Sequence, residues 1–352
     1  MNSELLSRTE CTALRGLAII GIFLHNYCHW LGPVIKENEY QFFGKNAEAM
    51  GRAIHNFDEL WVMHVLSFFG HYGVPIFLFL SAYGLVMKYE KGPSLITGAN
   101  YFRGAWDFVV QHFRKLWLMM FVGYAAFLMI DFITPGPHKY GFVDVAAQLL
   151  LVNNLLPTPD KVIWPGPFWF FGLMLQLYIV YRLLLYRRHW GWTLGAMVLC
   201  TLIQMACGPE SEELNRWRYN FVGGMLPFGL GLLSARQPML MNKPVAVCLT
   251  VISLLMIYSL SMSYFSWFLV PLFVCSFGYS LVKVLPSWSM RPLVWMGEIS
   301  AALFICHPIA RKIFIPISRH GDLYTGLLIY IVTSIALALL FRAMLRGISS
   351  RS

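Results

Sequence analysis

The stretch LRGLAIIGIFLHNYCHW, from Leu14 to Trp30, has the apolar character of a helix that crosses a membrane. It nevertheless carries Arg15 near its start and two histidines, His25 and His29, toward its end. A charged residue at the centre of a bilayer costs about 2.5–3.5 kcal/mol even on a lenient insertion scale. Polar groups in such a helix are therefore expected to serve a function, and we take Arg15 and His25 as catalytic candidates.

The composition of the whole chain indicates an integral membrane protein. Of its 352 residues, 58% are hydrophobic and only 12% are charged, against about 25% charged residues in an average soluble domain. So little polar surface would not cover a soluble core, and we expect the lipid bilayer to surround the chain. The net charge of +10 is spread over alternate short loops, as the positive-inside rule predicts. We therefore expect no nucleic-acid partner.

The apolar stretches predict the fold. A membrane span needs about 20 apolar residues, and we predict ten spans from an N-terminus that reads as a retained cytoplasmic end. The spans are expected at roughly 11–31, 68–88, 115–133, 165–187, 190–207, 219–234, 244–262, 264–283, 293–315 and 323–345. An even count then places both termini in the cytoplasm. The predicted fold class is an all-α polytopic membrane protein with one domain, residues 1–352.

Two segments between the spans have helical character of their own. The apolar segment 143–156 is short for a span, so we expect a re-entrant or interfacial helix there. Residues 95–116 interleave aromatic and basic side chains, which is typical of an amphipathic helix that approaches the membrane. This second segment leads into the third predicted span.

Arg15 and His25 lie ten residues apart, about 15 Å along a helix, with only apolar residues and glycine between them. Arg15 could reach the headgroups and His25 could bond a neighbouring helix. Alternatively, both line a polar cavity in which the imidazole transfers protons near neutral pH. His29 follows at i+4 on the same helix face. The sequence shows no third ligand in the HExxH manner, so we expect no metal site and a structural His29.

Other polar residues in or near the spans have two interpretations each. Ser81 could carry an acyl group, although a serine in a membrane helix more often bonds a neighbouring helix. Gln176 needs a polar partner at membrane depth and could line a cavity. Arg103, Arg114 and Lys115 precede the third span, where they either anchor the chain in the ordinary way or bind a phosphate-bearing ligand.

The order of these motifs resembles the integral-membrane acyltransferase-3 family of bacterial O-acyltransferases. The first-span arginine and histidine are followed by GVPIFLFLSAYG at 73–84, a basic entry to the third span, FWFFGLMLQLYIVYRLL at 168–184 and GEISAALFICHP at 297–308. The resemblance covers nearly the whole chain. The family usually leaves ten residues between its arginine and histidine, whereas this chain leaves nine, so strict counting puts Asn26 at the histidine position.

The resemblance implies a multi-pass protein of the inner, cytoplasmic membrane that transfers an acyl group, commonly acetyl, from cytoplasmic acyl-CoA. The implied acceptor is a hydroxyl of a sugar-containing molecule such as a cell-surface glycan. The family's first-span pair maps to Arg15 and His25, and its third-span arginine maps to Arg114. Acetyl-CoA is then the donor substrate, and no metal is expected.

These observations lead to one mechanistic hypothesis. CoA phosphates bind Arg114, Lys115 and Arg103, and the pantetheine arm carries the thioester inward along a polar cavity. His25 takes the proton from the acceptor hydroxyl, and Arg15 stabilises developing charge or holds the donor. Direct transfer and a path through an acyl-histidine or acyl-Ser81 intermediate both remain open.

A secondary transporter is the alternative class. Such proteins also have about ten spans with interrupted helices and buried polar groups near the midplane. This sequence, however, shows no repeated halves, and only Asp131 and Glu298 bring carboxylates near the spans. Proton-coupled carriers depend on such carboxylates, so the sequence favours the acyltransferase.

Overall fold

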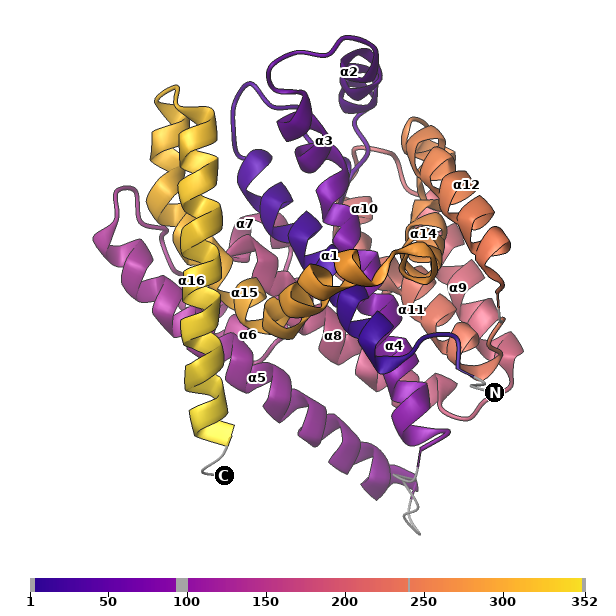
Figure 1. Cartoon of the computed structure of the whole chain (residues 1–352). Helices are drawn as coiled ribbons and strands as arrows, with labels where there is room; N and C mark the ends of the chain where they lie inside the picture. The colour runs from indigo at the N-terminus through magenta and orange to yellow at the C-terminus, as the bar shows by residue number, and fades with distance from the viewer. Residues whose placement is uncertain (1–3, 93–100, 240, 350–352) are drawn as a thin grey trace.

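The computed structural model describes residues 4–92, 101–239 and 241–349, and within these ranges every regular element is a helix (Figure 1). The all-α prediction is therefore confirmed. Seven segments are long and apolar enough to cross a membrane. They comprise α1 (Arg8–Cys28), α3 with η1 and α4 (Trp61–Phe69, Gly70–Tyr72 and Gly73–Tyr89), α5 (Tyr101–Ile133), η3 with α8 and η4 (Gly166–Phe168, Trp169–Val180 and Tyr181–Leu185), α12 (Lys243–Ser261), α15 (Ser287–Arg319) and α16 (Leu323–Ser349).

Three further apolar helices are shorter: α9 (Trp190–Met205), α11 (Phe221–Arg236) and α14 (Val270–Val284). Each of the ten predicted stretches thus contains a helix. Ten as the number of spans and the cytoplasmic side of the termini remain predictions, and residues 1–3 and 350–352 lie outside the described residues. The remaining helical segments are α2 (Gly44–His55), α6 (Phe142–Leu149), η2 (Asn153–Leu155), α7 (Pro159–Val162), α10 (Glu212–Tyr219) and α13 (Tyr264–Trp267).

The helix that contains the third predicted span is longer than the sequence indicated. α5 has 33 residues, which at 1.5 Å each make it about 50 Å long, against a bilayer core of about 30 Å. The span at 115–133 is its second half, and the amphipathic approach is its first half, apart from residues 95–100, which lie outside the described residues. The apolar segment 143–156 forms only the eight-residue α6 and one 3₁₀ turn, so it is too short for a span, as predicted.

Local sequence explains where α1 begins. The Ser7 hydroxyl accepts a hydrogen bond from the backbone N–H of Glu10, and the Glu10 carboxylate accepts one from the backbone N–H of Ser7. This reciprocal capping box satisfies two N–H groups that have no partner inside the helix. α1 therefore starts at Arg8, before its apolar residues, and continues through them to Cys28.

Glycines let α1 pack closely against α15. A Cβ atom at Gly16 would overlap the carbonyl oxygen of Leu293, and one at Gly297 would overlap the carbonyl oxygen of Thr12. Small residues at helix crossings permit this close backbone approach in membranes. α2 and the turn between α15 and α16 lie at one end of the helix assembly, and the first turns of α5 lie at the other (Figure 1). The C-terminal end of α1 lies toward the same end of the assembly as α2 (Figure 1), with His25 in its last turn and His29 directly after Cys28.

We expect Gly297→Ala to lower the thermal unfolding midpoint by about 3–8 °C, because an added methyl group forces α1 and α15 apart. Gly195→Ala is the matched control, since Gly195 is also within a helix but a Cβ there meets nothing within 4 Å. Unfolding of the detergent-purified variants, followed by light scattering or intrinsic fluorescence, measures both. Equal midpoints for the two variants would contradict the close crossing.

Candidate active site

His25 is held in place by its contacts with α3 and η1. Its side chain is only 3% exposed, and Nδ1 lies 2.7 Å from the carbonyl oxygen of Ser67 in α3. A carbonyl oxygen can only accept, so Nδ1 carries the proton and Nε2 of the neutral ring keeps its lone pair. Gly70 makes this approach possible, because a Cβ there would lie 2.7 Å from the Cβ of His25.

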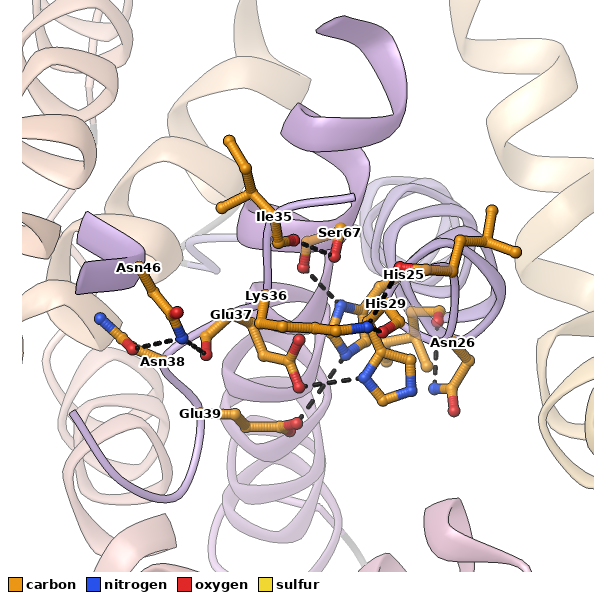
Figure 2. A network of polar contacts seen from close by, with 12 residues as sticks. His25, Asn26, His29, Ile35, Lys36, Glu37, Asn38, Glu39, Asn46 and Ser67 are labelled. Carbon is orange, nitrogen blue, oxygen red and sulfur yellow. Dashed lines mark hydrogen bonds and ion pairs between the residues drawn. The ribbon is translucent and has the colours of Figure 1, made fainter. Parts of the chain in front are cut away.

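The loop after α1 is tied to α3 and brings two carboxylates to this imidazole. The backbone N–H of Ile35 donates to Nδ1 of His64 at 3.2 Å, and the Ser67 hydroxyl donates to the carbonyl oxygen of Ile35 at 2.6 Å. These bonds fix the loop two residues before Glu37. Figure 2 shows Glu37 and Glu39 pointing toward the two histidines of α1.

The distances define a compact cluster. Oε2 of Glu39 lies 3.9 Å from Nε2 of His25, and Oε1 of Glu37 lies 3.0 Å from Nδ1 of His29. The rings of His25 and His29 are 4.6 Å apart, and the ring of His71 lies 5.5 Å from that of His25. We refer to His25, His29, Glu37, Glu39 and His71 as the His–Glu cluster.

The two carboxylates of the cluster have opposite protonation tendencies. Burial raises the pKa of Glu39 to about 8, helped by the neighbouring charge of Glu37 and opposed by that of Arg218. Burial also disfavours ionisation of Glu37, but the charge and the hydrogen bond of His29 outweigh it and lower the pKa of Glu37 below its ordinary value. At neutral pH the cluster therefore pairs an ionised Glu37 with a Glu39 that holds its proton.

The cluster also offers a set of potential metal ligands. One ligand atom from each of His25, His29 and Glu37 lies within 4.8 Å of the others. The sequence pattern showed no third ligand near the two histidines, and in this respect the structure corrects it, because the loop brings Glu37 back to them. The hydrogen bond between Nδ1 of His29 and Oε1 of Glu37 already gives each of these two atoms a partner without a metal.

A large cavity opens among α1, α4, α5, α8 and α15. Its volume is about 460 Å³, within the range of small-molecule sites. Arg15 contributes an exposed side chain, and the hydroxyl groups of Ser81 and Tyr178 lie 3.2 Å apart across two helices. We call this space the Arg15 cavity; it is lined by Cys11, Arg15, Ile22, Phe77, Leu80, Ser81, Tyr83, Gly84, Leu116, Met119, Phe170, Phe171, Met174, Tyr178, Ser300, Ala301, Phe304 and Ile305.

A second, smaller cavity lies on another face of α4 and α8. It holds about 40 Å³, and its wall includes Glu39 and His71 of the His–Glu cluster. We call it the His71 cavity; its other lining residues are Tyr40, Tyr72, Val74, Pro75, Leu78, Trp169, Leu173, Arg218, Gly223, Gly224, Pro227, Trp267 and Pro271. His25 lines neither cavity, but Ile22, one turn earlier on α1, lines the first, and its neighbours Glu39 and His71 line the second.

The three predicted phosphate-binding residues all lie on α5 and are exposed. Arg103 and Arg114 are eleven residues apart, so they share one helix face within about 20° at a spacing of about 16 Å. Leu116 and Met119 line the Arg15 cavity, whereas Arg103, Arg114 and Lys115 are not among its lining residues. The structure therefore places these bases outside the cavity wall.

The structure also shows which residue of α1 joins the cluster. Oδ1 of Asn26 accepts a hydrogen bond from Arg311 at 3.1 Å, while the imidazole of His25 joins the His–Glu cluster. Gln176 has the polar partners that its position required, namely the side chain of Asn220 and the backbone N–H of Phe221. Arg15 thus lines the Arg15 cavity, and His25, ten residues later, belongs to the His–Glu cluster; their catalytic roles remain a prediction.

Three residues of the cluster were not foreseen from the sequence. Glu37 and Glu39 belong to a polar loop, and His71 falls near the start of the predicted span 68–88. The ENE triplet eight residues after His29 is the one local signal, since two acids close to two histidines can pair with them. The fold of the loop decides that they do.

Apolar helices around a buried His–Glu cluster, with a cavity whose wall includes Glu39 and His71, define a multi-pass membrane protein with a site suited to proton transfer. A family model described as an acyltransferase domain matches residues 10–343, nearly the whole chain. The chain belongs to the acyltransferase-3 family and is a membrane acyltransferase. This result favours the enzyme over the transporter. No curated protein and no solved structure was found to match the chain.

The raised pKa of Glu39 predicts a pH-dependent stability. The folded chain keeps this proton up to about pH 8, whereas the pKa of an ordinary glutamate carboxyl is 4.5. Ionisation therefore favours the unfolded chain as the pH rises from 4.5 toward 8. We expect Glu39→Gln to gain thermal stability relative to the wild type over this window, with the difference growing until about pH 8.

Unfolding midpoints measured from pH 5 to 9 check this expectation. Glu48→Gln is the control, because Glu48 is an acid of the same type whose side chain is 75% exposed. Parallel pH profiles for wild type and Glu39→Gln would show that Glu39 titrates normally.

Proposed function

We propose that this protein is an O-acyltransferase of the inner membrane that moves an acetyl group from cytoplasmic acetyl-CoA to a hydroxyl of a sugar-containing acceptor. The observation that carries the proposal is the imidazole of His25, whose Nε2 keeps its lone pair and whose neighbours line two cavities. Membership of the family indicates acyl transfer, and the imidazole of His25 is a group that can activate a hydroxyl.

The Arg15 cavity suits the donor. Its apolar and aromatic walls match the pantetheine arm and acyl group of acyl-CoA, and its few polar groups can bond the amides of that arm. Arg103, Arg114 and Lys115 on the exposed face of α5 provide positive charge for the phosphates of CoA. Because these bases lie outside the cavity wall, we propose that the nucleotide end stays outside while the arm enters.

The transfer step follows from the protonation state of His25. Nε2 accepts the proton of the acceptor hydroxyl as the oxygen attacks the carbonyl carbon of the thioester. The new C–O bond forms, the C–S bond breaks, and the imidazolium gives its proton to the departing CoA thiolate. The bond from Nδ1–H to the carbonyl oxygen of Ser67 keeps the ring oriented throughout.

The geometry also favours particular roles for Arg15 and Ser81. Arg15 lies about 15 Å from His25 along α1, too far for both side chains to reach one carbonyl group, so we propose that Arg15 holds the donor arm. The Ser81 hydroxyl is bonded to Tyr178 and belongs to the same cavity wall, with no imidazole among its lining residues. This arrangement supports direct transfer over an acyl-Ser81 intermediate.

We expect His25→Ala to lower acetyl-CoA turnover by about 10²–10⁴-fold, because the base that activates the attacking oxygen is lost. The slow hydrolysis of acetyl-CoA to CoA measures this without knowledge of the acceptor. His55→Ala is the control, since His55 is an exposed histidine on α2. The same assay in EDTA tests the proton-based mechanism, in which a chelator leaves turnover unchanged.

Thermal stabilisation by CoA distinguishes chemistry from binding in these variants. His25→Ala should still be stabilised by CoA as the wild type is. A His25→Ala protein with full turnover would contradict the base assignment. A wild-type protein that neither binds CoA nor releases it from acetyl-CoA would contradict the proposed function.

A side chain inserted into the Arg15 cavity should block the donor. A Cβ at Gly84 meets nothing within 4 Å, so Gly84→Phe can place its ring in the cavity without displacing backbone. We expect kcat/KM for acetyl-CoA to fall on the order of tenfold or more. Gly195→Phe, at an equally open glycine far from the cavity lining, is the control. Unchanged donor kinetics in Gly84→Phe would place the donor elsewhere.

A further inference from the structure

We propose that the His71 cavity is the acceptor subsite and that it takes two neighbouring hydroxyl groups of a neutral sugar ring, one facing His25 and the other facing His71. The inference rests on the proposed function and goes beyond it, because it names the part of the acceptor that is recognised and the residues that recognise it. Three features of the cavity support this assignment.

The first observation is a set of buried polar atoms without partners. Neither ring nitrogen of His71 nor Nε1 of Trp267 makes a hydrogen bond of normal geometry among the described residues, although the backbone of Phe68 and the hydroxyl of Tyr72 lie close to them. These side chains are only 4% and 1% exposed, and both line the His71 cavity. Buried polar groups in folded proteins are nearly always bonded. A cavity whose wall presents one imidazole and one indole N–H is therefore built to receive polar groups.

The second observation is the size of the space. The cavity holds about 40 Å³, and a single water needs about 10–15 Å³ on the same measure, so about three hydroxyl-sized groups fit. A whole sugar ring does not. Trp169 and Tyr40 add flat apolar surface to the wall, and their rings meet edge to face at 5.5 Å. The space thus fits the hydroxyl-bearing edge of a ring that rests against aromatic side chains.

The third observation is the charge of the wall. The guanidinium group of Arg218 is already engaged, since its Nε donates to the carbonyl oxygen of Glu39 at 2.9 Å and its plane lies 4.3 Å from the ring of Trp267. The groups that remain for a ligand are the imidazole of His71 and the indole N–H of Trp267, and both suit a hydroxyl group.

The distances around His25 determine where the two hydroxyl groups lie. The rings of His25 and His71 are 5.5 Å apart, and Oε2 of Glu39 lies 3.9 Å from Nε2 of His25. The 3.9 Å gap is too long for a direct hydrogen bond, and a hydroxyl group can bond both atoms at once. The adjacent hydroxyl then reaches His71. In this arrangement His71 is a positioning residue that selects the hydroxyl to be acetylated.

Binding of a simple glycoside tests the subsite independently of catalysis. Saturation-transfer-difference NMR with methyl α-D-glucopyranoside, on protein in a detergent without a sugar headgroup, gives the dissociation constant. Cyclohexanol, which has the ring and a single hydroxyl, is the matched probe. We expect the glycoside to bind the wild type more tightly than cyclohexanol does. His71→Ala should weaken glycoside binding about tenfold, and Trp267→Phe, which keeps an aromatic ring but removes the indole N–H, should weaken it several-fold.

Steady-state kinetics with the same glycoside as acceptor provide the second readout. In His71→Ala we expect KM for the glycoside to rise about tenfold while KM for acetyl-CoA stays within twofold, and His71→Gln should recover part of the loss. His55→Ala serves as the control here as well. Equal glycoside affinity in wild type, His71→Ala and Trp267→Phe, or cyclohexanol binding as tight as the glycoside, would overturn the subsite.

The two readouts separate the subsite from the function on which it rests. Glycoside binding that depends on His71, in a protein that releases no CoA, supports the cavity assignment and contradicts the acyltransferase mechanism. Acetyl transfer to the glycoside that is unaffected by His71→Ala supports the mechanism and overturns the subsite.

Discussion

An imidazole buried among apolar helices has to be hydrogen-bonded, because an unsatisfied polar group in a low-dielectric interior costs several kilocalories per mole. His25 meets this requirement through the bond from Nδ1–H to the carbonyl oxygen of Ser67. That bond requires α1 and α3 to touch, and the contact in turn requires glycine at position 70. Helix packing, the tautomer of the ring and the direction of Nε2 are thus consequences of one constraint.

The loop that follows α1 turns this histidine into a cluster. Its two carboxylates are only two residues apart, yet the pKa of Glu37 is lowered and that of Glu39 is raised. A bonded histidine stabilises the first charge, whereas burial next to that charge disfavours the second. Environments that separate the pKa values of neighbouring groups are typical of sites that transfer protons.

The two cavities lie on different faces of α4. α4 contributes Phe77, Leu80 and Ser81 to the Arg15 cavity and Val74, Pro75 and Leu78 to the His71 cavity. Helical periodicity sends these two sets to different faces, so one helix separates two ligand spaces. In the proposed function, the donor occupies the first of these spaces and the acceptor the second.

The sequence by itself determined the membrane class, the helices and the presence of Arg15 and His25 on one of them, because apolar length and helical periodicity are local properties. Only the tertiary structure decided that Glu37, Glu39 and His71 meet His25, and that the basic residues of α5 lie outside the cavity wall. A polar loop has no periodicity from which its contacts can be read. Its course depends on bonds such as those of Ile35 to His64 and Ser67, whose partners lie about 30 residues away in the chain.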